Sequence, residues 1–167
     1  MNPYFLNILL RCLELGFNIL ILTNAMKPMM KVQEELTKII KRFPHQITMR
    51  VSLDHYTQRG HELERGRGTW ETTIQNLSWL ALQGIHLHIA GRTFINESIE
   101  DVRNGYAVLF IELSLNIDAQ NPTELVLFPE LDGSIDVPEI TTGCWDTLNL
   151  NPNDIMCNSI MCSRICM

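Results

Sequence analysis

Two polar side chains at the end of an alternating segment are suited to ligand binding. Ser52 and Asp54 lie two residues apart in residues 47–54, so in an extended strand both point to the same face. A hydroxyl and a carboxylate on one face can hydrogen-bond a ribose or an amino acid. The alternative is that they cap the end of the strand where the chain enters a loop. These two residues alone do not decide between the interpretations.

A basic candidate follows in the sequence HELERGRG at residues 61–68. Its glycines would let the backbone approach a ligand closely, and the Arg65 guanidinium could grip a carboxylate through two hydrogen bonds. The alternative is a solvated charged loop, which is the commoner outcome for such a run taken alone.

Histidines and cysteines raise the question of a metal. His86 and His88 lie two apart and could form half of a metal site, but no third ligand is near in sequence, so we expect buried or interior-filling histidines. Cys144 and Cys157 belong to a group of closely spaced cysteines after residue 143 whose intervals match no zinc pattern. Iron–sulfur ligation and a chance cluster both remain open for this group.

Apolar periodicity predicts the elements that must position these residues. We expect strands at residues 17–22, 47–54, 85–93 and 125–128, helices at 4–15, 32–43, 70–83 and 98–113, and a long loop at 57–68. The first strand should be covered on both faces, as parallel strands are. Alternating strands and helices imply parallel strands joined by crossovers, with sites at the strands' carboxyl ends.

Both a doubly wound sheet and a barrel sector agree with this alternation. The polar second faces of residues 47–54 and 85–93 favour the barrel, because barrel strands can line a working interior. We therefore predict an α/β fold, a sector of a parallel (β/α) partial TIM-type barrel with about four β/α units. It should span residues 1–130, and residues 131–167 should form an irregular tail that begins a truncated following region.

Composition excludes several classes of function. A formal charge of −6 and a pI near 5.3 argue against a nucleic-acid partner, which needs clustered Lys and Arg. The chain has no apolar run of about 18 residues and no secretion signal, so we expect a cytoplasmic protein without a membrane partner. In that reducing compartment its five cysteines should be free thiols or metal ligands.

The sequence RVSLDH at residues 50–55, followed by His61, Glu64, Arg65 and GRGTW at 66–70, resembles the fourth strand and following loop of the radical S-adenosylmethionine enzymes. ILILTN at residues 19–24 is similar to their third strand, and MNP at residues 1–3 is similar to the residues after their Gly-Gly-Glu-Pro motif. The resemblance runs from residue 1 to about residue 157.

This resemblance implies a partial barrel that binds S-adenosylmethionine and a [4Fe-4S] cluster and cleaves S-adenosylmethionine to a 5′-deoxyadenosyl radical. It implies that Ser52 and Asp54 contact S-adenosylmethionine and that Arg65 contacts its carboxylate, with Arg92 a weaker candidate. Cys144 and Cys157 are similar to cysteines that hold auxiliary clusters in some members of the family.

The chain departs from the family in one respect that matters for activity. The cluster-binding C-x-x-x-C-x-x-C loop and the Gly-Gly-Glu-Pro motif do not occur in it. We therefore expect a truncated member of the family, without its principal cluster and inactive as given, whose full-length form is an iron–sulfur oxidoreductase or peptide-modifying enzyme. The alternative is a non-catalytic β/α domain that binds a small ligand or another protein and has its own closed core.

Overall fold

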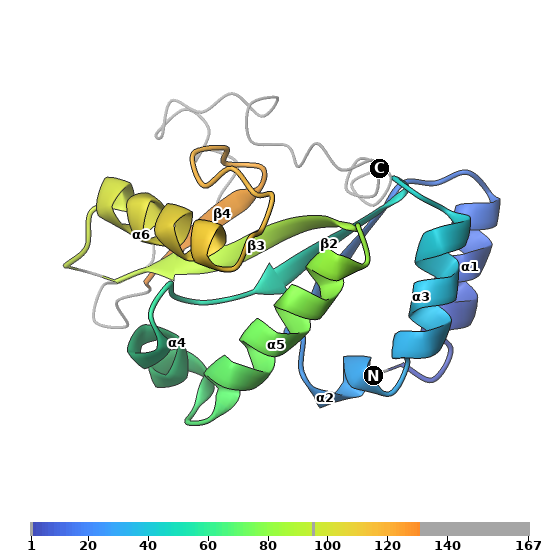
Figure 1. Cartoon of the computed structure of the whole chain (residues 1–167), viewed down its shortest axis with the longest axis horizontal. Helices are drawn as coiled ribbons and strands as arrows, with labels where there is room; N and C mark the ends of the chain where they lie inside the picture. Colours follow the sequence, from blue (N-terminus) through green and yellow to red (C-terminus); the bar gives the residue numbers. More distant parts are fainter. Residues whose placement is uncertain (1, 95, 131–167) are drawn as a thin grey trace, which may run out of the picture. The chain divides into compact units, whose positions relative to one another are not determined.

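The computed structural model describes residues 2–94 and 96–130, and in them four strands alternate with helices (Figure 1). The strands are β1 (Ile19–Thr23), β2 (Ile47–Ser52), β3 (His86–Thr93) and β4 (Leu125–Pro129). The helices are α1 (Phe5–Glu14), α2 (Lys27–Met30), α3 (Gln33–Arg42), α4 (Gln58–Arg65), α5 (Thr69–Leu82) and α6 (Ile99–Glu112). The predicted α/β class is confirmed. The predicted tail at residues 131–167 lies outside the described residues.

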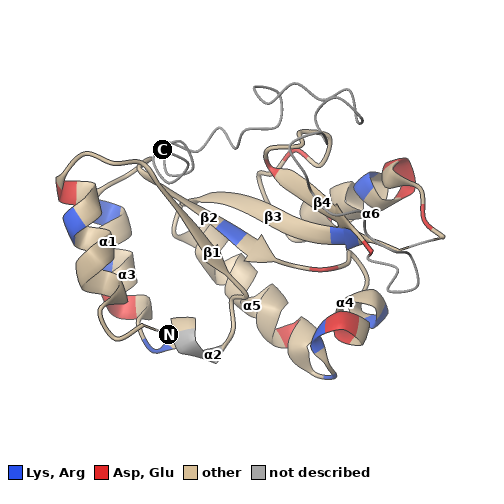
Figure 2. Cartoon of the chain, turned by 180° about the vertical axis from the view of Figure 1, so that it is seen from behind, with Lys and Arg blue, Asp and Glu red and all other residues tan. Residues whose placement is uncertain are grey.

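The strands form one parallel sheet in the order β1-β2-β3-β4. Each strand therefore pairs with its neighbour in the chain, and the order does not reverse within the described residues. Right-handed crossovers that always advance in one direction place their helices on the same face of a sheet. Figure 2 looks from behind and shows the strands in front of α5, whereas in Figure 1 this helix lies in front of the sheet.

One face of the sheet is buried and the other is only partly covered. Met49, Val51 and Ile89 point to the buried face and join the core with residues of the helices. The alternate positions of β2 and β3 are half-buried or exposed. The alternation predicted for these two strands is thus confirmed.

Strand β1 does not match the prediction that both of its faces are covered. Leu22 is 71% exposed and Leu20 is also exposed, so the apolar residues of this strand alternate between core and surface. A continuous apolar run therefore does not by itself show that a strand is enclosed, because periodicity cannot separate the two cases.

The predicted long loop at residues 57–68 is wrong, because most of it forms α4. Thr57 begins the helix by accepting a hydrogen bond from the Gly60 N–H at 3.2 Å, a standard N-cap. Gly66, with φ of 93°, ends it. The helix is short and mostly polar, so it has too few apolar residues to show a helical period.

None of the helices in the described part of the chain is long and apolar enough to cross a membrane.

Candidate functional site

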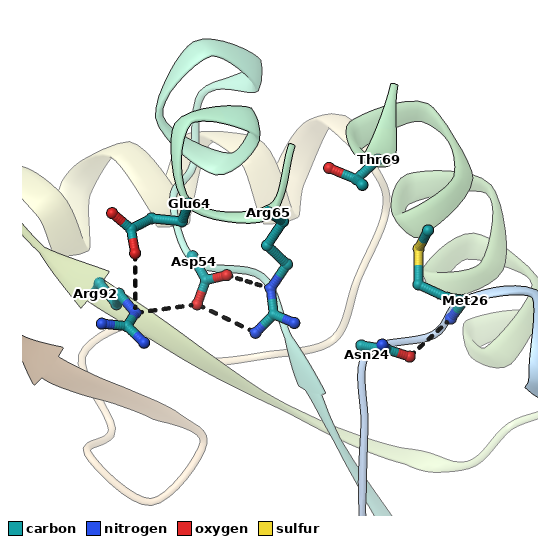
Figure 3. Close-up of a pocket in the computed structure, with 7 residues that line it drawn as sticks. All are labelled: Asn24, Met26, Asp54, Glu64, Arg65, Thr69 and Arg92. Atoms are coloured by element: carbon teal, nitrogen blue, oxygen red, sulfur yellow. Dashed lines mark hydrogen bonds and ion pairs between the residues drawn. The ribbon is translucent and has the colours of Figure 1, made fainter. Parts of the chain in front are cut away.

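The carboxyl ends of the strands bring three polar residues to one pocket. Asn24 follows β1, Asp54 lies just beyond β2, and Arg92 is next to last in β3. Because the strands are parallel, these ends share one edge of the sheet. The pocket has a volume of about 350 Å³ and is lined by Asn24, Met26, Asp54, Glu64, Arg65, Thr69 and Arg92 (Figure 3).

Asp54 is the centre of the ion pairs in this pocket. The Arg65 Nε donates to Asp54 Oδ2, and Arg65 Nη2 lies 3.3 Å from Asp54 Oδ1. The Arg92 Nε lies 3.4 Å from the same Oδ1 and 3.6 Å from Glu64 Oε2. Figure 3 shows the two arginines on either side of the carboxylate. The structure therefore brings together the predicted residues Asp54, Arg65 and Arg92.

These four residues, Asp54, Glu64, Arg65 and Arg92, form what we call the charged quartet. The Asp54 side chain is only 7% exposed, whereas those of Arg65 and Arg92 are 29% and 39% exposed. A buried carboxylate needs charged partners, and the two guanidinium groups supply them. With two acids and two bases the quartet has no formal charge, and its arginines keep N–H groups at the pocket surface.

Helix α4 places two members of the quartet against the strand end. It begins at Gln58, soon after Asp54, and its last turn carries Glu64 and Arg65. The turn that follows is held by the Glu62 carboxylate, which accepts the Gly68 N–H at 2.9 Å. The position of Arg65 thus depends on a capped helix and a fixed exit turn, and a mobile charged loop would not provide it.

The backbone of Asp54 is held on both sides. Its N–H donates to the Nδ1 of His61 at 3.2 Å, and its carbonyl accepts the N–H of Arg92 at 2.8 Å. The preceding carbonyl, of Leu53, accepts the Tyr106 hydroxyl at 2.6 Å. The chain is therefore fixed beyond the last residue of β2, where the carboxylate begins.

Burial changes the acid–base properties of the two side chains that hold this backbone. His61 is fully buried, and burial lowers its pKa, an effect that Asp54 opposes and Arg65 reinforces. Burial likewise raises the pKa of Tyr106 well above its usual value, and the Asp54 carboxylate adds to this. Both side chains are thus held neutral. The sequence did not predict a role in the site for either, because His61 binds the backbone of Asp54, and Tyr106 that of Leu53, from another element.

Ser52 does not line the quartet's pocket. It lines a neighbouring pocket of about 500 Å³, whose walls are mostly apolar side chains: Phe5, Ile21, Leu22, Thr23, Asn24, Met29, Val32, Leu36, Met49 and Ser52. Asn24 lines both pockets. The two strand-end candidates, Ser52 and Asp54, therefore face neighbouring hollows that meet at Asn24.

A second buried histidine ties the segment after β2 to the segment after β3. His55 Nε2 lies 3.0 Å from Glu97 Oε1, and His55 Nδ1 lies 2.7 Å from Thr57 Oγ1. Its ring stacks on Tyr56 and on Phe94, with centroids 4.2 Å and 5.0 Å away. Glu97 is 42 residues distant in sequence, so no local pattern could have predicted this pair.

The histidines of β3 lie away from the quartet. His86 is exposed, and its ring lies 5.7 Å from that of His45. His88 is half-buried, and burial, reinforced by Arg50, lowers its pKa. Among residues 2–94 and 96–130, no three His, Cys, Asp or Glu side chains are grouped to hold a metal ion. Cys144 and Cys157, the predicted auxiliary ligands, lie outside these residues.

Comparison with known proteins gives no further guide to the site. Neither the protein-family models, nor the curated proteins, nor the solved structures include a match to this chain.

Proposed function

We propose that the chain is part of a radical S-adenosylmethionine protein and binds S-adenosylmethionine at the charged quartet without cleaving it unaided. The observation that carries the proposal is the pair of arginines around Asp54 at the carboxyl ends of parallel strands. An amino-acid group carries a carboxylate and an ammonium. The quartet offers guanidinium groups for the first and carboxylates for the second.

The strand order supports the barrel sector that this proposal includes. A doubly wound sheet reverses its strand order at a switch point and has helices on both faces. The described strands run β1-β2-β3-β4 without reversal, and one face is left partly open. An open face lined by Thr48, Arg50 and His88 is what the interior of an incomplete barrel would present.

The quartet and the neighbouring pocket are suited to the two ends of S-adenosylmethionine. On binding, the amino-acid end of S-adenosylmethionine would replace ion pairs that Arg65 and Arg92 make within the quartet. Ser52, which lines the apolar pocket, offers a hydroxyl to a ribose. The full-length family supplies a [4Fe-4S] cluster that reduces S-adenosylmethionine. The described residues offer only Cys12 as a thiol, so they do not suit that cluster.

Calorimetry of the whole chain with S-adenosylmethionine tests the proposal, with methionine and adenosine titrated separately. Arg65→Gln should weaken binding of S-adenosylmethionine about tenfold or more, because a charge-assisted bidentate contact contributes on that scale. Arg67→Gln is the matched control: the residue is exposed, lies two positions away and does not line the pocket. Equal affinity of the two variants, or no binding by the wild type, would refute the proposal.

The inactivity has its own test. After anaerobic reconstitution with iron and sulfide, the chain should form no 5′-deoxyadenosine from S-adenosylmethionine, because C-x-x-x-C-x-x-C does not occur in it. Turnover by this chain alone would contradict this part of the proposal.

One observation favours a second candidate, a non-catalytic β/α domain in which the quartet is a structural ion-pair network. The Asp54 carboxylate already has both arginines as partners and is nearly buried, so it needs no ligand. In that case calorimetry would detect no binding, while loss of Asp54 would still destabilise the fold.

A further inference from the structure

We propose that His61 is a positioning residue for the site, whose neutral ring accepts the Asp54 N–H and so sets where the Asp54 carboxylate meets Arg65 and Arg92. The inference rests on the proposed function, because it concerns the same pocket. It assigns a role to a buried side chain that does not line the pocket itself.

The hydrogen bond fixes the tautomer of the ring. The Asp54 N–H is a donor and lies 3.2 Å from His61 Nδ1, so Nδ1 must be the unprotonated nitrogen. The ring hydrogen is then on Nε2, an atom that is buried and has no hydrogen-bond partner among the described residues. The ring packs against Trp70 of α5, with centroids 5.8 Å apart and an angle of 65° between the rings.

The hydrogen bond from the Asp54 N–H to His61 restrains the backbone at a residue that lies beyond the end of β2. Asp54 lies beyond the paired residues of β2, and its carbonyl is tied to β3 by the Arg92 N–H. The His61 ring supplies the opposite tie, from α4. Since the carboxylate branches from this residue, a turn of its backbone would move both oxygens away from the guanidinium groups of Arg65 and Arg92.

Protonation of His61 would break this arrangement. A protonated ring has a donor on each nitrogen, so Nδ1 would oppose the Asp54 N–H. The charged groups that act on His61 are Asp54 at the end of β2 and Glu62 and Arg65 on its own helix, while α5 places the uncharged Trp70 ring against it. Burial opposes the charge most strongly. The contact is therefore made by the neutral ring.

Three substitutions separate the acceptor from the bulk of the ring. In His61→Asn the amide oxygen can occupy the place of Nδ1, in His61→Gln it reaches the place of Nε2, and His61→Phe keeps the ring without an acceptor. We expect His61→Asn to keep the affinity for S-adenosylmethionine within about threefold. The other two should lose about tenfold, the factor expected for one hydrogen bond.

A measurement without ligand keeps this inference distinct from the proposed function. Nitrogen-15 NMR of the wild type should show His61 with Nδ1 unprotonated and Nε2 protonated. The Asp54 amide and the Arg65 Nε–H should stay protected from exchange in the wild type and in His61→Asn, and lose protection in His61→Gln.

Each outcome then has one meaning. The opposite tautomer, or equal protection in the Asn and Gln variants, would overturn the positioning role even if S-adenosylmethionine binds. Failure of the wild type to bind, with the NMR result as expected, would refute the proposed ligand and leave His61 as the residue that orients Asp54. If His61→Phe does not fold, the Asn and Gln pair still decides.

Discussion

At the scale of single residues, a carboxylate that is almost wholly buried depends on what surrounds it. Asp54 has two guanidinium groups for its oxygens and two backbone bonds for its main chain. If the Asp54 charge is removed, Arg65 and Arg92 both lose their shared partner, and Glu64 remains beside Arg92. Loss of one partner of a buried pair costs more than the pair contributes, because the other charge is left uncompensated.

We therefore expect Asp54→Asn to lower the free energy of unfolding by about 1.5–3 kcal/mol, the range for hydrogen bonds to charged groups. Partial exposure of both arginines keeps the loss below that of a fully buried pair. Urea denaturation measures the change. Glu112→Gln, an exposed residue at the end of α6, is the control and should change stability by less than about 0.5 kcal/mol. An unchanged free energy of unfolding in Asp54→Asn would mean that the quartet does not stabilise the fold.

At the scale of elements, the contact between β3 and α6 also supports the site. A Cβ added at Gly91 would overlap the Tyr106 hydroxyl and lie 2.8 Å from its Cζ. That hydroxyl donates to the Leu53 carbonyl, immediately before Asp54. The missing side chain at Gly91 is what lets Tyr106 reach across the sheet.

Gly91→Ala should therefore cost about 1–3 kcal/mol of stability, the usual penalty of overpacking. In a Tyr106→Phe background, where the hydroxyl is absent, the same substitution should cost clearly less. A double-mutant cycle measured by chemical denaturation gives this difference. Additive effects would show that the ring and the glycine do not compete for this space.

The sequence predicted the strands better than the short helices. Strict alternation in residues 47–54 and 85–93 identified β2 and β3 and their buried faces. Helices α2 and α4 were not predicted, because four and eight residues give too little periodicity. A helical period needs more residues than these two helices contain.

The candidate site, too, could be predicted only in part from the sequence. Parallel strands imply that their carboxyl ends meet, so Asp54 and Arg92 could be expected at one edge of the sheet. The roles of His61, Tyr106 and Glu97 could not be predicted, because each depends on which residue lies opposite in the fold. Tyr106 and Leu53 are 53 residues apart in the chain, so their contact depends on how the elements between them pack.

At the scale of the whole molecule, we expect the buried His61 and the half-buried His88 to make stability depend on pH. Burial lowers the pKa of both His61 and His88 in the folded chain. The unfolded chain, with a histidine pKa near 6.5, then binds more protons than the folded chain at mildly acidic pH. Stability rises with pH where the unfolded state holds more protons. The contribution of these two histidines to the free energy of unfolding should be fully present above about pH 6.5 and should decrease as the pH drops below that value.

Thermal unfolding between about pH 5.5 and 8, the range in which histidine titrates, tests this. His61→Asn should flatten part of the slope below pH 6.5, since one of the two shifted groups is gone. His45→Asn, a change at an exposed histidine, should leave the slope unchanged. The same slope in His61→Asn as in the wild type would indicate that other groups cause the dependence.

The short distance along the chain between Asp54 and Arg65 has a consequence for how the molecule folds. Only 11 residues separate the two, and Thr57 and His61, which hold the same segment, lie between them. A loop of about ten residues closes in about 10–100 ns, whereas the pairing of distant strands is much slower. The ion pair between Asp54 and Arg65 can therefore form and re-form locally, before the sheet is complete. The contact between Asp54 and Arg92, 38 residues apart, forms only when β3 pairs with β2.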